Sequence, residues 1–162
     1  MDGVLEINMK YIILTIKHKW FVLLAGIKLR VPMWQLIMHD SSKFRLWRAY
    51  NNQFFGDKSM NNEFAYAWLE HQNCEKHHWE YWIPRSSHNK VDSLMSNIEP
   101  LDMPERYIRE MIADWLGAGR AYEGKWPSKN NWIWFNNNRE RIYKNLHPRT
   151  RKMIDIIIDI YL

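Results

Sequence analysis

The stretch His39-Asp40-Ser41-Ser42-Lys43-Phe44 follows an apolar run from Trp34 to Met38 and holds an imidazole, a carboxylate and an ammonium group within five residues. Further histidines and one aspartate lie on both sides of it in the chain. They are His18, His71, His77, His78 and Asp114. Borderline divalent metals prefer imidazole and carboxylate ligands. We therefore interpret these residues as candidates for one divalent-metal site inside a helical domain.

The periodicity of apolar residues predicts an all-α fold. From Met9 to Leu29 they recur at spacings of three and four, which indicates a helix with a broad buried face (Ile12, Ile13, Ile16, Trp20, Leu23, Leu24, Ile27). Pro32 and Pro104 suit helix starts. Further helices are expected over about 44–55, 61–71, 104–116, 130–145 and 148–162, with a stop at Gly117-Ala118-Gly119 and a turn from Arg120 to Lys129. No segment alternates with period two, so we expect a single-domain bundle of about seven helices over residues 1–162.

Composition limits the class of protein. A chain of 162 residues suggests one domain, and 46% hydrophobic residues argue against disorder. The net charge of +5 permits an anionic partner, nucleic acid included, although scattered basic residues also suit solvated helix faces. No apolar run is long enough to cross a bilayer, so we expect no membrane partner, and the pattern leaves the oligomeric state open. The single cysteine, Cys74, excludes an internal disulfide and fits a reducing cytoplasm. Its side chain could be a small buried residue or a metal ligand.

The candidate ligands sit in otherwise apolar stretches. His18, the His39-Asp40 pair and Asp114 fall on three different predicted helices. A buried carboxylate is costly unless it is paired or bound to metal, and Asp114 is the clearest such case. His71 and His78, seven residues apart, would share one helix face, and His77 joins them if the polar interval 72–75 breaks the helix.

Each of these residues also has a structural interpretation. His18 alone fits a hydrogen-bonded core histidine, Asp40 a helix cap, and His77 and His78 surface positions beside aromatic residues. His88 lies in the polar segment 85–102, the longest irregular stretch, and His147 precedes a proline. We interpret those two as structural or exposed.

The order of these residues resembles the HD superfamily of metal-dependent phosphohydrolases, whose fold is an all-helical bundle. Carried over by position, His18 corresponds to the first histidine, His39 and Asp40 to the His-Asp pair, and Asp114 to the final aspartate. His39-Asp40-Ser41-Ser42-Lys43 resembles the form found in the branch that hydrolyses cyclic dinucleotides. His71, His77 and His78 resemble that branch's additional ligands in type and order, whereas its Gly-Tyr-Pro motif does not follow His78.

The whole chain also resembles a small HD-like family found in bacteria and phages, which implies no substrate. The similar phrases are His39-Asp40-x-Ser42-Lys43-Phe44, Ala67-Trp68-Leu69, His77-His78-Trp79 and Ile112-Ala113-Asp114-Trp115-x-Gly117-Ala118-Gly119-Arg120. A cytoplasmic protein, plausibly encoded by a phage, is the corresponding expectation.

The resemblance implies a metal-dependent phosphohydrolase that acts on a nucleotide or another phosphoester. His18, His39, Asp40 and Asp114 would hold one ion of Mn, Fe, Ni, Mg or Zn, and His71, His77 and His78 would hold a second ion or position the substrate. Asp40 would bridge the two, Lys43 or Arg120 would neutralise phosphate charge, and Trp79 and Trp82 would stack a base. Two alternatives stay open at this point: a helical module that binds nucleic acid or protein without turnover, and an ion that only holds the helices together.

Overall fold

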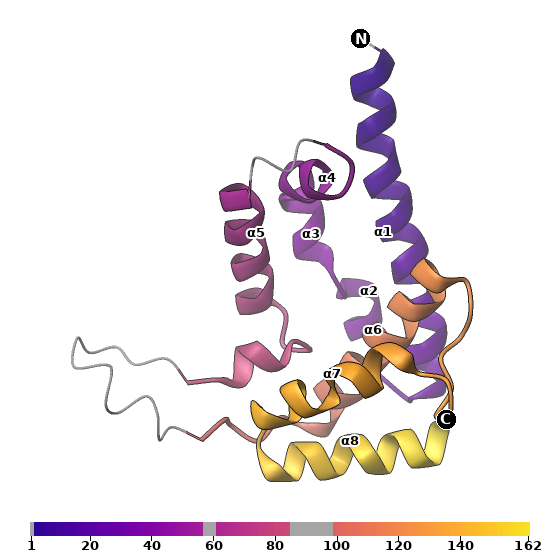
Figure 1. Ribbon diagram of the computed structural model, residues 1–162, viewed down its shortest axis with the longest axis vertical. Coiled ribbons are helices and arrows are strands. Elements are labelled where there is room, and N and C mark those ends of the chain that lie inside the picture. The colour runs from indigo at the N-terminus through magenta and orange to yellow at the C-terminus, as the bar shows by residue number, and fades with distance from the viewer. Residues whose placement is uncertain (1, 57–60, 85–98) are drawn as a thin grey trace, which may run out of the picture.

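The computed structural model describes residues 2–56, 61–84 and 99–162, and all regular structure in these ranges is helical (Figure 1). In chain order the elements are α1 (Asp2–Lys28), α2 (Met33–Met38), α3 (Ser41–Arg45), α4 (Trp47–Phe55), α5 (Asn61–Cys74), the short 3-10 helix η2 (Trp79–Trp82), α6 (Glu105–Glu123), α7 (Ile133–Lys144) and α8 (Pro148–Tyr161). The predicted all-α, single-domain bundle is confirmed. His88 and most of the polar segment 85–102 lie outside the described residues.

Helices α1 and α6 pack side by side, and the other helices gather around them in two places. Figure 1 shows α3, α4 and α5 beside the first half of α1, whereas α7 and α8 lie at the opposite end of the molecule. The larger buried cluster joins α1, α6, α7 and α8 through residues such as Val22, Ile112 and Ile154. A smaller cluster centres on Tyr11, Tyr50 and Ala67. Helix α1 contributes to both clusters and therefore connects the two parts of the bundle.

The side of α1 that faces the protein differs from the predicted one. The apolar stripe of Ile13, Ile16, Trp20, Leu24 and Ile27 is 40–57% exposed, so the prediction that it is buried is wrong. The buried side instead carries Tyr11, Thr15, His18, Val22, Ala25 and Leu29. Both sides of this helix are largely apolar, so periodicity alone could not choose between them. The observed choice turns the His18 imidazole inward.

Helix α6 continues through the glycines that were expected to end it. A Cβ atom at Gly117 would lie 2.6 Å from a methyl carbon of Val22, and one at Gly119 would lie 2.6 Å from Cγ of Pro127. These glycines therefore allow close packing on neighbouring chain segments rather than a break in the helix. The helix ends at Gly124, whose φ of +74° belongs to the left-handed region.

Two further departures are local. The expected helix 44–55 is divided at Leu46, where φ is −110°, into α3 and α4. Cys74, the last residue of α5, is an exposed free thiol rather than a buried apolar residue. Among the described residues, none of the helices combines the length and the apolar character that crossing a membrane requires.

Candidate metal centre

The predicted ligands approach one another from four parts of the chain. His18 lies on α1, Asp114 on α6 and His71 on α5, while His77 and His78 lie in the turn between α5 and η2. His39 ends α2 and Asp40 begins α3 with φ +58° and ψ +18°. Aspartate is one of the few residues that enter this left-handed region readily, although such backbone still costs about 1 kcal/mol. The sharp turn at Asp40 directs its carboxylate and the His39 ring into the same space.

Group one, defined as His18, His39, Asp40 and Asp114, has donor atoms that all lie within 4.8 Å of one another. His18 Nε2 lies 2.9 Å from Asp114 Oδ1 and 3.2 Å from Asp40 Oδ2. His39 Nε2 lies 3.3 Å and 3.6 Å from the same two oxygens. Two imidazole nitrogens and two carboxylate oxygens therefore face a common centre.

Group two, defined as Asp40, His71, His77 and His78, meets the same distance limit. His71 Nε2 lies 3.3 Å from Asp40 Oδ1, and His77 Nε2 lies 3.8 Å from that oxygen. His78 Nε2 approaches His71 Nε2 to 2.8 Å. The polar interval 72–76 does end α5, and this break is what lets His77 turn toward the other two histidines.

The Asp40 carboxylate is shared between the groups. Its Oδ2 faces the two histidines of group one, and its Oδ1 faces His71 and His77 of group two. Asp40 is fully buried at 0% exposure, so solvent does not screen either oxygen. A carboxylate with one oxygen toward each of two donor groups is suited to bridge two cations.

Several of these buried polar atoms have no hydrogen-bond partner within the ranges that the structure describes and could instead coordinate a cation. Within the described part of the chain, the Nε2 atoms of His18, His39 and His77 and the Oδ1 atom of Asp40 form no hydrogen bond of acceptable geometry. Buried polar atoms without a partner are rare in native proteins, and each calls for an explanation. The donor set is the imidazole and carboxylate mixture that borderline divalent metals prefer. Buried His and Asp side chains are thus placed to bind a metal ion.

Glu110 supports His39 from behind and lies close to His77, and the sequence analysis did not single it out. Its Oε1 accepts from Nδ1 of His39 at 3.1 Å and lies 3.5 Å from Nδ1 of His77. Gln35 Nε2 donates to its Oε2 at 2.6 Å. A carboxylate at Nδ1 fixes the tautomer that leaves Nε2 free for a metal. Glu110 precedes Asp114 by one helical turn, and this spacing was the available sequence signal.

His71 has an equivalent support on its other face. Its Nδ1 donates to Ser42 Oγ at 2.7 Å, and Ser42 Oγ donates to Glu75 Oε1 at 2.9 Å. Ser42 belongs to the His-Asp stretch, so the same segment supplies Asp40 and orients a ligand of group two. No periodicity pointed to Glu75, because it lies in the turn after α5.

The two groups differ in their protonation without metal. Burial opposes charge on both histidines of group one, but the carboxylates outweigh it: Asp114 raises the pKa of His18, and Asp40 is the main cause of a His39 pKa of about 10. In group two, burial lowers the pKa of His71 to about 3 and that of His78 well below its usual value. The two histidines of group one therefore favour the protonated form, whereas His71 and His78 favour the neutral form.

Lys43 supplies a fixed positive charge beside the shared carboxylate. Its Nζ donates to Asp40 Oδ2 at 2.6 Å. Although burial raises the Asp40 pKa, this ammonium and the neighbouring imidazoles hold it well below its usual range. Lys43 therefore occupies the side of Asp40 on which group one lies.

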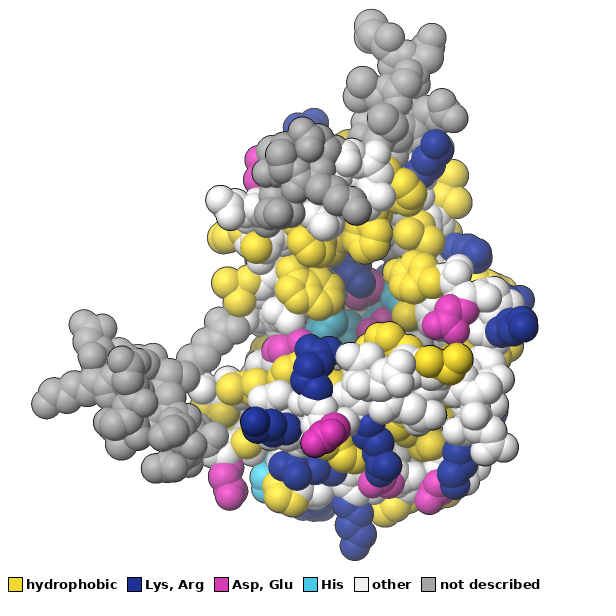
Figure 2. All heavy atoms as spheres, in the orientation of Figure 1, with side chains coloured by type: hydrophobic (Ala, Val, Ile, Leu, Met, Phe, Trp, Pro, Cys, Tyr) yellow, Lys and Arg dark blue, Asp and Glu magenta, His cyan; other side chains and the backbone are white. Residues whose placement is uncertain are grey.

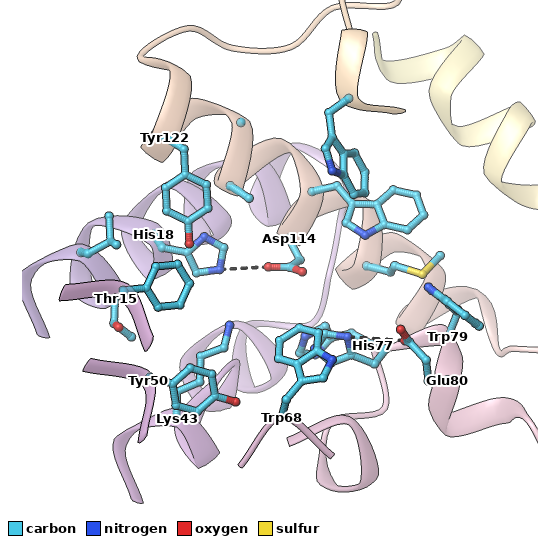
Figure 3. A pocket seen from close by; sticks show the side chains of 18 of the residues that line it. Thr15, His18, Lys43, Tyr50, Trp68, His77, Trp79, Glu80, Asp114 and Tyr122 are labelled. Carbon is cyan, nitrogen blue, oxygen red and sulfur yellow. Dashed lines mark ion pairs between the residues drawn. The ribbon is translucent and has the colours of Figure 1, made fainter. Parts of the chain in front are cut away.

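A cavity of about 380 Å³ opens onto both groups. Figure 2 shows histidine and acidic side chains at the bottom of a hollow rimmed by hydrophobic ones. Figure 3 shows His18, Lys43, His77 and Asp114 pointing into it between aromatic residues. Its aromatic lining residues are Tyr11, Tyr50, Phe54, Phe64, Trp68, Trp79, Trp115, Tyr122, Trp132 and Trp134.

Two of the predicted substrate-binding residues do not line this cavity. Trp82 packs against Tyr107 with ring centroids 5.8 Å apart, and its indole N–H donates to the carbonyl of Lys76. Arg120 donates to the carbonyl of Gly124 and lies over the Phe21 ring. The cavity takes its guanidinium from Arg141 on α7 instead, while Lys43 and Trp79 line it as expected.

Comparison with known proteins identifies the family of this chain, but that family has no assigned activity. Searches of curated proteins and of solved structures each found no match. Residues 8–160 match a family described as a family of unknown function (DUF5662). That match covers nearly the whole chain and every member of both donor groups, so the protein belongs to the family of unknown function DUF5662.

Proposed function

We propose that this protein is a metal-dependent phosphohydrolase of the HD type that acts on a nucleotide or another small phosphoester. The observation that supports it most is the Asp40 carboxylate, which presents one oxygen to each of two buried donor groups. Each group also contributes side chains to the lining of one cavity, His18 and Asp114 from group one and His77 and His78 from group two. Hydrolysis of phosphoesters commonly uses paired divalent cations about 3.5–4 Å apart, held by a shared ligand.

In this proposal, one set of residues binds the cations and another set binds the substrate. Group one and group two would each hold one cation of Mn, Fe, Ni, Mg or Zn. When bound, such a cation lowers the pKa of a coordinated water from about 15.7 to about 7 and neutralises charge on a phosphoryl oxygen. Glu110 orients the imidazole of His39, and the Ser42–Glu75 pair orients that of His71.

The chain's own cations face the same space. Lys43, which lines the cavity, is placed to pair with phosphate, and Arg141 offers a second positive group on the cavity wall. The aromatic walls limit access of bulk water and suit a flat ring on the substrate. Trp79 and Trp68 are the lining indoles on the side of group two.

A phosphoester screen tests the proposal. The purified protein, loaded separately with each of the five metals, should release phosphate from phosphomonoesters, phosphodiesters or nucleotides, and a chelator should stop turnover. Asp40→Asn should lose turnover and metal, whereas His147→Asn, which alters a histidine at the start of α8 and keeps a capping side chain, should keep both. Full metal occupancy with no turnover of any phosphoester would contradict the proposal and indicate a structural ion.

A further inference from the structure

The outward side of α1 is an apolar stripe that nothing in the described protein covers. Ile13, Ile16, Trp20, Leu24 and Ile27 recur at spacings of three and four, so they form one face about 20 Å long. Each is 40–57% exposed. The opposite side of α1 packs on α6, where Val22 meets Gly117, so the stripe points away from the body of the protein.

Helix α2 adds a second exposed apolar face next to the first. Met33, Trp34, Ile37 and Met38 are 53–63% exposed, whereas Gln35 and Leu36 are buried. Gln35 reaches Glu110 on α6, so the exposed side of α2 also points away from α6. Lys19 Nζ on α1 donates to the carbonyl of Ile37 at 3.2 Å, which places the two helices side by side. Nine large exposed apolar side chains therefore lie on adjacent helices, and contiguous apolar surfaces commonly mark interaction sites.

Within residues 7–39, the part of the chain that carries this surface, all charged side chains have one sign. Between Ile7 and His39 the chain has five basic residues and no acidic residue. Lys10, Lys17, Lys28 and Arg30 are exposed, and none of them pairs with an acidic side chain among the residues described. Basic residues elsewhere do pair, as Lys129 does with Asp159 and Arg139 with Asp155. At 100° per residue, the three lysines lie about 60–80° from the centre of the stripe and so form its edge.

We infer that the outward faces of α1 and α2 dock on an anionic membrane surface. An apolar helix face with an exposed Trp and a lysine border is the pattern of helices that lie in the plane of a bilayer interface. Trp20 and Trp34 have the amphipathic ring favoured at that depth. The lysines and Arg30 then meet lipid phosphates. The expectation of no membrane partner was based on the lack of a segment long enough to span a bilayer. A helix that lies on the membrane surface needs no such segment, so that expectation does not apply to this contact.

Charge argues against a second copy as the occupant. A two-fold contact uses the same surface on both partners. Such a contact over residues 7–39 would bring eight exposed basic side chains together with no acidic one, because each copy contributes Lys10, Lys17, Lys28 and Arg30. Like charges across an interface oppose association. A lipid surface of opposite sign avoids this repulsion.

Vesicle sedimentation of the whole protein tests the inference and does not depend on metal or turnover. Phosphatidylcholine vesicles containing phosphatidylglycerol should bind more than about tenfold more protein than pure phosphatidylcholine vesicles, and high salt should remove most of the difference. The variant Lys10→Glu/Lys17→Glu/Lys28→Glu should lose the preference. Lys125→Glu/Lys144→Glu/Lys152→Glu, with the same charge change at exposed lysines of other segments, should keep it.

A second variant tests the contribution of the apolar side chains to membrane binding. Ile16→Asn/Trp20→Asn should reduce binding to anionic vesicles at least tenfold with circular dichroism unchanged, because both side chains are more than half exposed. Equal weak binding to both vesicle types would overturn the inference. So would equal losses in the two lysine variants, or a stable dimer in sedimentation velocity that Ile16→Asn/Trp20→Asn converts to monomer.

Discussion

The two donor groups share one carboxylate but differ in charge and in origin. Group one adds Asp114 and two histidines from helices of the larger core, and group two adds three histidines from the end of α5 and the turn after it. Two carboxylates raise the pKa values of His18 and His39 in group one, whereas burial lowers those of His71 and His78 in group two. A cation would displace protons from charged imidazoles in group one, whereas in group two it would replace the hydrogen bond between the Nε2 atoms of His71 and His78.

This difference also affects which ion each group favours. Imidazole-rich sites suit Zn, Fe and Ni, while sites with more oxygen ligands accept Mn and Mg. Group two should therefore retain its ion more firmly than group one. Four experiments test whether the two groups differ in this way.

The largest effect should come from Asp40→Asn. Asparagine tolerates the left-handed backbone of Asp40, but it is neutral and cannot offer an anionic oxygen to both groups. We expect metal content to fall from up to two ions per chain to near zero, with turnover reduced by at least about a thousandfold. Elemental analysis of the purified variant measures its metal content. Retention of both ions would show that the groups do not depend on a shared carboxylate.

Removing one group at a time should divide the metal content. His18→Ala affects group one alone, and His71→Ala affects group two alone. Each variant should lose one ion and keep the other, and each should lose most of the turnover, because both ions contact the substrate in the proposal. Loss of both ions from either variant would mean that the groups form a single centre.

The pH dependence should separate the groups further. The folded pKa of His39 lies above its unfolded value, at about 10, so its protonation stabilises the metal-free fold below about pH 6.5 and that contribution disappears as the pH rises toward 10. A cation requires the neutral ring, so affinity for group one should rise over the same interval, by about tenfold per pH unit for each proton released.

Calorimetry of the two single-group variants measures these protons. Titration of His71→Ala in buffers of different ionisation enthalpy should show proton release on metal binding. His18→Ala, which keeps His71 and His78 with their lowered pKa values, should show less proton release near neutral pH. Equal proton release by the two variants would contradict the assigned difference.

The smallest effect should come from Glu110→Gln. Glutamine keeps the size of the side chain but is a weaker acceptor for the Nδ1 proton of His39 and removes the negative charge near His77. Changes of this kind typically weaken metal affinity by about 10- to 100-fold. Glu105→Gln, at an exposed position of the same helix, serves as the control. Unchanged affinity in Glu110→Gln would show that Glu110 does not orient the ligands.

The sequence identified residues that the fold brings together, but not the surfaces around them. His18 and Asp114 could be found because a polar residue inside an apolar helix is unusual and needs a reason to be buried. Glu110 and Gln35 lie one turn from Asp114 and His39, and they were missed because a support behind a ligand has no composition signal of its own. Trp82 and Arg120 could not be placed, because their positions depend on how the segments pack rather than on local pattern.

The same limit explains the errors in the fold. Helix α1 is apolar on two sides, so spacing identified a helix but not its buried face. Gly117 and Gly119 looked like a stop, yet their role depends on Val22 and Pro127, which are distant in sequence. Contacts between remote segments decide both cases.

Anomalous X-ray diffraction from crystals grown with Mn²⁺ tests the shared carboxylate most directly. The account predicts two peaks on opposite sides of Asp40, one within about 2.5 Å of donor atoms from His18, His39 and Asp114, and the other equally near those of His71, His77 and His78. A single peak away from Asp40, or none at full Mn²⁺ exposure, would contradict it.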